Sequence, residues 1–179
     1  SSGLFAVNVG HCHPEVIAAV KEQVEKVMQV SILQTTEPLI ALAEKLVEIT
    51  PPNLTKCYFT NGGAESIDTA HQYTGKYEII VLKNAFHGLT GWALAGTGAT
   101  SYKKGFGPLP TGFLRAPHAY CYRCPFERSY PSCELRCAQE IENIVLDQAI
   151  STVSEGSIGA VLVEPVQGRG GIIPPDDWL

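Results

Sequence analysis

Hydrophobic residues recur at helical spacing in three segments of the chain. The first segment runs from Pro14 to Met28 and places its valines and an isoleucine on one side of a helix, with Pro14 at a position that suits a helix start. A second helix is predicted from Pro38 to about Ile49, and the Pro51-Pro52 pair ends it. A third is predicted over Cys133–Leu146, where leucine, isoleucine and valine alternate with charged residues.

Three shorter apolar runs predict strands. They cover Cys57–Thr60, Glu78–Leu82 and Ile158–Val163, and helical or loop segments separate them. Short apolar runs in that arrangement are typical of buried parallel strands, so we predict an α/β fold with a doubly wound, mostly parallel sheet and helices on both faces. The stretch from Gly96 to Tyr130 is rich in glycine, proline and aromatic residues and is predicted to be an irregular excursion.

Composition and charge exclude several classes of function. The chain has 179 residues, 45% of them hydrophobic, and a net charge of −5. It has no basic stretch that would favour nucleic acid, and no apolar run long enough to span a membrane. No signal peptide is visible, which favours the cytoplasm, or a mitochondrion if a transit peptide precedes the chain. Because the chain stops after Trp178-Leu179 without a closing helix, we expect it to be a fragment.

Polar and glycine-rich clusters follow all three predicted strands. Phe59–Ser66 places a glycine pair between an apolar run and a probable helix start, whose unpaired N–H groups and partial positive charge suit a phosphate. The same segment also fits a tight turn with no ligand. Asn84–Gly88 and Glu164–Gly168 follow the other two runs, and ligands of open α/β sheets bind at the carboxyl ends of strands. The three clusters together favour a ligand site.

Four segments, in order, resemble the class III (ω-amino acid) aminotransferases, which depend on pyridoxal 5'-phosphate (PLP). Asn8–Pro14 resembles the family's Gly-His-x-His-Pro signature, and Phe59–Glu65 resembles its phosphate turn. Phe86–Gly88 resembles its aromatic-His-Gly step, and Glu164–Gly168 its Glu-Pro-x-Gln-Gly strand end. The resemblance implies the fold-type I PLP-dependent transferase fold, incomplete here. It also implies a transaminase that moves an amino group from an ω-amino acid or alanine-like donor to a 2-oxo acid, and a homodimer.

The resemblance also assigns the two parts of the chain to domains of the family's fold. Residues 1–34 would belong to the small domain and its linker helix, and residues 35–179 to the first, truncated part of the large PLP-binding domain. The Schiff-base lysine and the aspartate against the pyridine nitrogen lie beyond Leu179 in the family, and no lysine of this chain matches that motif. The fragment alone is therefore expected to be inactive. The alternative from another class is a non-catalytic truncated paralogue.

Five site residues carry over by position. The backbone N–H groups of Gly63 and Ala64 would hold the cofactor phosphate, and Phe86 would stack on the pyridine ring. His87 beside it would act in catalysis or bond to the backbone as a structural residue. Glu164 would lie near cofactor and substrate, or cap a loop.

The sequence departs from the family pattern at three points. Ala64 stands where the family often has Ser or Thr, which removes one side-chain contact to the phosphate. Arg169 stands where several members that use ornithine or 4-aminobutyrate carry Glu, so the donor is left open. The helix after Glu65 also lacks about four residues, roughly one turn.

Four of the six cysteines cluster within 17 residues. The spacing of Cys121, Cys124, Cys133 and Cys137 resembles that of a four-thiolate zinc site, so a metal-binding module is a second alternative function. The other interpretation is a set of free thiols in a substrate-side excursion, with no metal bound.

Overall fold

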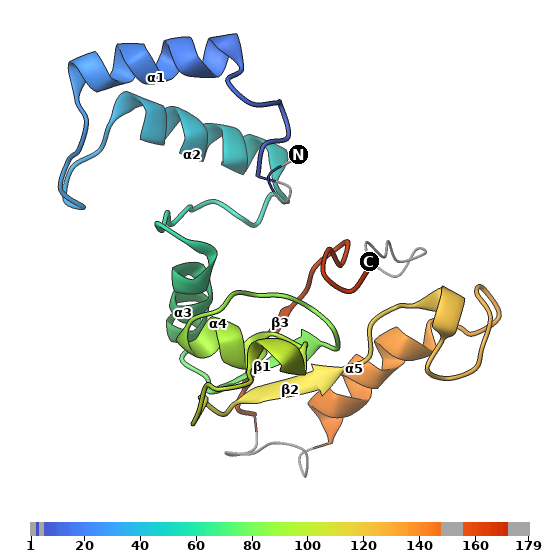
Figure 1. The fold of residues 1–179 in the computed structure, drawn as a ribbon. Coiled ribbons are helices and arrows are strands. Elements are labelled where there is room, and N and C mark those ends of the chain that lie inside the picture. Colours follow the sequence, from blue (N-terminus) through green and yellow to red (C-terminus); the bar gives the residue numbers. More distant parts are fainter. Residues whose placement is uncertain (1–2, 4–5, 148–155, 172–179) are drawn as a thin grey trace. The chain divides into compact units, whose positions relative to one another are not determined.

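The computed structural model describes residues 3, 6–147 and 156–171 (Figure 1). They form two compact units, Ser1–Tyr58 and Phe59–Leu179. The predicted division at residue 34 refers to domains of a complete protein and stays a prediction.

The first unit consists of two helices and their connections. Helix α1 spans Pro14–Lys26 and α2 spans Glu37–Ile49, and each has a proline in its first turn, where the missing N–H costs nothing. Both predicted helices are confirmed. No side chain of either helix is buried, so their apolar faces, Val16 and Val20 among them, remain exposed in the described residues.

The second unit is built on a three-stranded parallel sheet with the strand order β2-β1-β3. Strand β1 spans Glu78–Leu82, β2 spans Phe113–Ala116 and β3 spans Ile158–Leu162. All five residues of β1 are buried, because it has a neighbour on each side and helices above and below. The predicted runs at Glu78–Leu82 and Ile158–Val163 are therefore strands, and the parallel sheet is confirmed.

Helices cover both faces of this sheet, as predicted (Figure 1). Leu114 and Ala116 of β2 point to α5, which spans Arg136–Leu146 and buries Ile144 against them. The alternate residue Phe113 points the other way. There its ring lies 5.8 Å from that of Trp92 in helix α4 (Gly91–Gly96). Helix α3 (Gly63–Thr74) packs beside α4 on that face.

Two predictions about strands were wrong. The run Cys57–Thr60 is extended but pairs with no strand among the described residues, and its first three residues are exposed. An apolar run becomes a strand only where a ladder partner is available. Strand β2, in contrast, lies inside the stretch that was predicted to be irregular. It has only four residues, so an alternation of apolar and polar positions cannot be recognised among the surrounding glycines and prolines.

Helix α5 begins three residues later than the predicted Cys133. Glu134 and Leu135 have φ angles of 50° and 52°, which lie in the left-handed region and cannot continue a right-handed helix. Helix α3 has 12 residues and ends at Gly75, whose φ of 63° is readily adopted only without a Cβ.

Candidate cofactor site

The start of α3 is an open turn with no side-chain cap. Gly62 is its N-cap residue and lies in extended backbone. The carboxylate of Glu65 accepts the N–H of Asn61 at 2.8 Å, which closes the turn behind the helix start. No acceptor among the described residues meets the N–H groups of Gly63 and Ala64. A Cβ built on Gly63 would have no atom within 4 Å. These two N–H groups are therefore free to bind an anion.

The loop after β1 is tied to the end of β3 by Glu164. Its Oε2 accepts the backbone N–H of Phe86 at 2.8 Å, across 78 residues of sequence. The Phe86 ring is half-buried and meets the ring of Tyr102 edge-on, with 5.4 Å between centroids. The structure thus brings Phe86 and Glu164 together, as their places at neighbouring strand ends predicted. By accepting the N–H of Phe86, Glu164 caps the loop after β1.

Thr97, at the end of α4, holds the same loop from the other side. Its side chain is fully buried, and Oγ1 accepts the N–H of His87 at 3.0 Å. The hydroxyl lies 2.9 Å from the carbonyl oxygen of Gly88 and 3.1 Å from that of Ala93, and it donates to one of them. One hydroxyl therefore accepts the N–H of His87 and lies within donating distance of the carbonyl of the next loop residue, Gly88.

Gly98 and Gly88 allow the close approach of these segments. The N–H of Gly98 donates to the carbonyl of Ala85 at 2.7 Å. A Cβ on Gly98 would lie 2.5 Å from the backbone nitrogen of Asn84, so only glycine fits. At Gly88, whose φ is 133°, a Cβ would lie 3.8 Å from Ala64. The loop after β1 and the turn that starts α3 are therefore neighbours.

His87 presents a neutral imidazole to this site. Its Nε2 is buried and has no hydrogen-bond partner among the described residues. Burial, and then the positive charge of Arg115, lower the pKa of His87 from 6.5 to about 4. Arg115 itself is anchored, because it donates to the carbonyl oxygens of Ala95 at 2.8 Å and Thr97 at 3.2 Å. The ring of His87 is uncharged at neutral pH. Its backbone N–H forms the hydrogen bond to Thr97, and its Nε2 forms none with a described residue.

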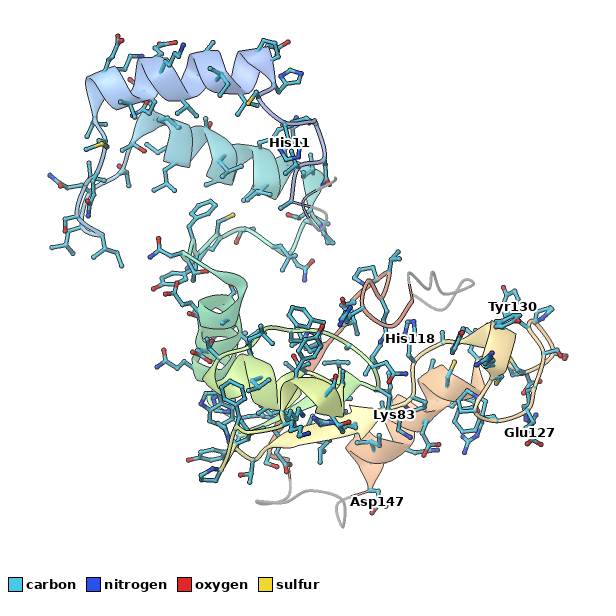
Figure 2. All side chains as sticks on the ribbon, viewed as in Figure 1. His11, Lys83, His118, Glu127, Tyr130 and Asp147 are labelled. Atoms are coloured by element: carbon cyan, nitrogen blue, oxygen red, sulfur yellow. The ribbon has the colours of Figure 1, made fainter. Side chains whose placement is uncertain are left out.

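Gln167 closes the site next to the ends of β1 and β2. It is fully buried and donates from Nε2 to the carbonyl of Lys83 at 2.9 Å, while its Oε1 has no partner among the described residues. It shares a cavity of about 140 Å³ with Lys83, Asn84 and His118. Figure 2 shows Lys83 and His118 at this end of the sheet. Polar groups from all three strand ends thus meet here, as expected for a parallel sheet.

Sequence reasoning missed three residues of this site. Thr97, Tyr102 and Arg115 all lie in the stretch that was predicted to be an irregular excursion. Their roles depend on contacts with the loop after β1, which local patterns do not encode. The Gly96-Thr97-Gly98 triplet was the available signal, since paired glycines often mark a close approach of two backbones.

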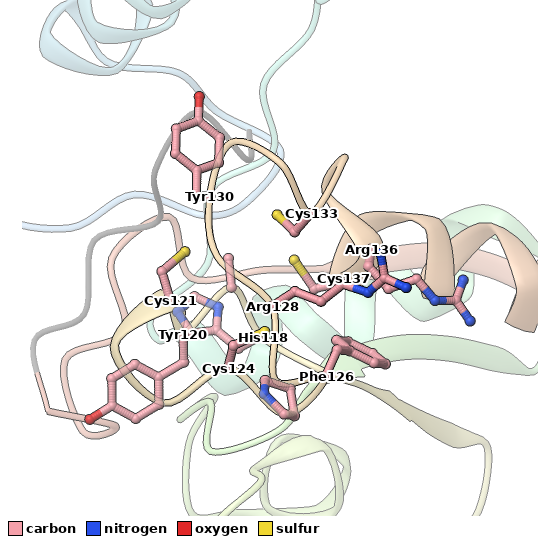
Figure 3. Close-up of a pocket in the computed structure, with 12 residues that line it drawn as sticks. His118, Tyr120, Cys121, Cys124, Phe126, Arg128, Tyr130, Cys133, Arg136 and Cys137 are labelled. Carbon is pink, nitrogen blue, oxygen red and sulfur yellow. The ribbon is translucent and has the colours of Figure 1, made fainter.

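The four clustered cysteines line a separate cavity (Figure 3). None of the four cysteines forms a disulfide among the described residues, and the cavity of about 20 Å³ is no larger than a water molecule requires. Among the described residues, no three His, Cys, Asp or Glu side chains are placed to hold one metal ion. Burial raises the pKa of Cys137, which disfavours the thiolate that a metal would need. Phe126, Arg128 and Tyr130 also line the space around the thiols. The four-thiolate site stays a prediction.

Comparison with known proteins identifies the family. The sequence profile of the family Aminotransferase class-III matches residues 1–179. Acetylornithine aminotransferase of Methanocaldococcus jannaschii is 37% identical over 99% of this chain, which spans 40% of that protein. A probable 4-aminobutyrate aminotransferase of Bacillus subtilis is 35% identical over 98% of this chain, which spans 41% of that protein.

Solved structures agree with this comparison. A thermostable (S)-enantioselective omega-transaminase from Thermomicrobium roseum aligns with a TM-score of 0.83 and 35% identity, over 99% of this chain and 41% of its own. A PLP-bound aminotransferase mutant from Vibrio fluvialis aligns with a TM-score of 0.78 and 30% identity, over 98% of this chain and 40% of its own. These are transaminases of PLP fold type I, and this chain has the corresponding part of that fold.

The described part of the chain contains no helix with the length and apolar character needed to cross a bilayer. The family profile covers every residue, and the two relatives and the two solved structures extend over almost the whole chain. The chain belongs to the class III aminotransferase family.

Proposed function

We propose that the complete protein is a PLP-dependent transaminase that moves an amino group from an ω-amino acid or alanine-like donor to a 2-oxo acid. The chain spans 40% of the length of its archaeal acetylornithine aminotransferase relative, so the proposal concerns more sequence than is described here. One observation carries it. The open start of α3, the Phe86 loop and Glu164 meet at one end of the parallel sheet.

The residues present fit the cofactor. The N–H groups of Gly63 and Ala64 have no acceptor among the described residues and lie at the positive end of a helix dipole, where a phosphate is favoured. Because Ala64 carries no hydroxyl, the phosphate would be held there by the backbone. The half-buried ring of Phe86 offers an apolar face to a planar heterocycle. Bound there, PLP supplies an electron sink for the electron pair left when the substrate loses a proton.

The surrounding side chains orient the residues that would touch the cofactor. Glu164 accepts the N–H of Phe86 and so sets the position of that ring. Thr97 does the same for the backbone of His87 and Gly88. The neutral ring of His87 adds no positive charge beside the cofactor, since its pKa is lowered to about 4. We assign to these residues the rigid placement that ordered chemistry requires.

The proposal extends to assembly and domains. We propose a homodimer, in which residues 1–34 belong to the small domain and residues 35–179 to the large one. The exposed apolar faces of α1 and α2 support the view that the first unit packs against further protein. The small-molecule partners are an amino donor and a 2-oxo acid.

A visible absorption spectrum of the complete protein tests the function. With PLP added, we expect a band of bound cofactor that disappears with 4-aminobutyrate or alanine and returns with a 2-oxo acid. Pyridoxal, which lacks the phosphate, serves as the control and should bind much more weakly if the start of α3 holds the phosphate. A protein that leaves PLP free in solution, or binds pyridoxal equally well, would contradict the proposal.

A further inference from the structure

Arg169 is held beside the ring-binding residue of the site. It lies in the turn of residues 168–171 after β3, its side chain is exposed, and its guanidinium carbon lies 5.2 Å from the centre of the Tyr102 ring. Tyr102 in turn contacts Phe86, with 5.4 Å between ring centroids. A cation and two aromatic rings thus form a continuous row that ends at Phe86. The stacking fixes the guanidinium at the edge of the site.

No carboxylate neutralises this cation in the described part of the chain. The ion pairs formed there lie within α1, α2 and α5, and none includes Arg169. A guanidinium carries its N–H groups in one plane, in the fork geometry that binds a carboxylate with two hydrogen bonds. Arg169 is therefore positioned to accept an anionic group from outside the described chain.

Two other cations near the site are already engaged. Arg115 donates to the carbonyl oxygens of Ala95 and Thr97, and Lys103 donates to that of Ala95 at 3.0 Å. They hold the end of α4 and are half-buried. Arg169 differs from them because it is exposed and none of its N–H groups binds a described acceptor. Arg169 therefore keeps its N–H groups available at this edge of the site.

We propose that Arg169 binds the carboxylate of the amino donor, so that the substrates are amino acids whose carboxylate lies away from the reacting amine. This inference rests on the proposed transaminase function and deepens it. The distinction between donors with and without a carboxylate matters for this protein. The similar proteins include acetylornithine and 4-aminobutyrate aminotransferases on one side and an amine transaminase on the other. Arg169 assigns this protein to the class that recognises a carboxylate.

The test compares two donors with the same carbon chain in the complete PLP-loaded enzyme. 4-Aminobutyrate carries the carboxylate, and n-butylamine lacks it. The donor half-reaction is followed alone, by loss of the visible band with no 2-oxo acid present, because the acceptor carries a carboxylate of its own. Arg169→Gln should raise the apparent Kd of 4-aminobutyrate about tenfold to a hundredfold, the value of a charge-assisted hydrogen-bonded pair. The Kd of n-butylamine should stay within about twofold.

Two further variants separate the charge from its geometry. Arg169→Lys keeps the charge and loses the planar fork, so an intermediate loss is expected. Arg136→Gln is the matched control, because Arg136 also lies over an aromatic ring, at 5.6 Å from the ring centre of Phe126, and lines the separate cysteine cavity. It should change neither donor. An equal loss for both donors with Arg169→Gln, or a loss as large with Arg136→Gln, would refute the proposal.

A binding measurement without chemistry gives the second readout. Butyrate has the carboxylate and no amine, so calorimetry on the enzyme reports the carboxylate site whether or not transamination occurs. We expect Arg169→Gln to weaken butyrate binding by the same factor as it weakens 4-aminobutyrate. Unchanged butyrate binding would overturn the assignment. A missing cofactor band would instead contradict the proposed function, and the butyrate titration would still decide the role of Arg169.

Discussion

Replacing Thr97 with valine removes one hydroxyl from the interior and leaves the shape of the side chain almost unchanged. The hydroxyl accepts the N–H of His87 and lies within donating distance of the carbonyl oxygen of Gly88. The carbonyl of Ala93, its other neighbour, keeps a partner because the N–H of Thr97 also donates to it, at 3.0 Å. Thr97→Val therefore leaves the N–H of His87 without a protein acceptor and removes a side-chain donor within reach of the carbonyl of Gly88.

The expected loss of stability follows from these two groups. A buried hydrogen-bonding group without a partner costs about 1–3 kcal/mol, and His87 and Gly88 are only half-buried, so the lower part of that range applies to each. We expect Thr97→Val to lower the free energy of unfolding by about 1–4 kcal/mol, the lower end for the His87 group alone and the upper end for both groups. The loop that carries Phe86 should loosen as well, so the affinity for PLP should fall.

Thr74→Val is the matched control. Thr74 also accepts one backbone N–H, from Lys76 at 3.2 Å, and donates to one carbonyl, that of His71 at 3.0 Å. It is partly exposed at the end of α3, so water can replace both bonds. The same substitution should cost less than about 1 kcal/mol there.

Urea denaturation followed by the fluorescence of Trp92 measures both variants. Trp92 packs on Phe113 and so reports on the second unit. The chain has two tryptophans, and Trp178 lies outside the described residues, so all measurements use a Trp178→Phe background. If Thr97→Val and Thr74→Val cost the same, burial of the Thr97 hydroxyl does not hold the loop, and the reasoning is refuted.

Two further predictions concern the same loop. Gly98→Ala would place a methyl group 2.5 Å from the nitrogen of Asn84, so it should destabilise the second unit by about 1–3 kcal/mol in the same urea assay. Gly63→Ala, with no atom within 4 Å, should change stability by less than about 0.5 kcal/mol, and similar values for the two would contradict the steric argument. His87 has a pKa of about 4 in the folded chain and 6.5 as its ordinary value, so the unfolded chain binds more protons between these pH values. The stability that His87 contributes should be complete above pH 6.5 and decline towards pH 4. His87→Gln should remove that part of the decline when the free energies of unfolding from urea melts at pH 7.5 and pH 4.5 are compared. An identical decline in both proteins would exclude the effect.

Helices α1, α2 and α5 and two of the strands were predictable from local patterns. The apolar spacing in Pro14–Lys26 and Glu37–Ile49 and the runs at Glu78–Leu82 and Ile158–Leu162 each identify their own element without reference to the rest of the chain. The edge at which a ligand would bind was also predictable, because the carboxyl ends of parallel strands lie together. The Glu164–Phe86 contact agrees with that expectation.

The sequence by itself therefore determined the fold class, the family resemblance and the loops that would surround a cofactor. The tertiary structure alone decided that Phe113–Ala116 is a strand and Cys57–Thr60 is not. It also decided that Thr97 and Tyr102 support the Phe86 loop, and that the four clustered thiols line one small cavity. The physical reason is the same in each case. Strand pairing, burial of a hydroxyl and convergence of thiols depend on partners distant in sequence, whose positions are set only when the whole unit packs.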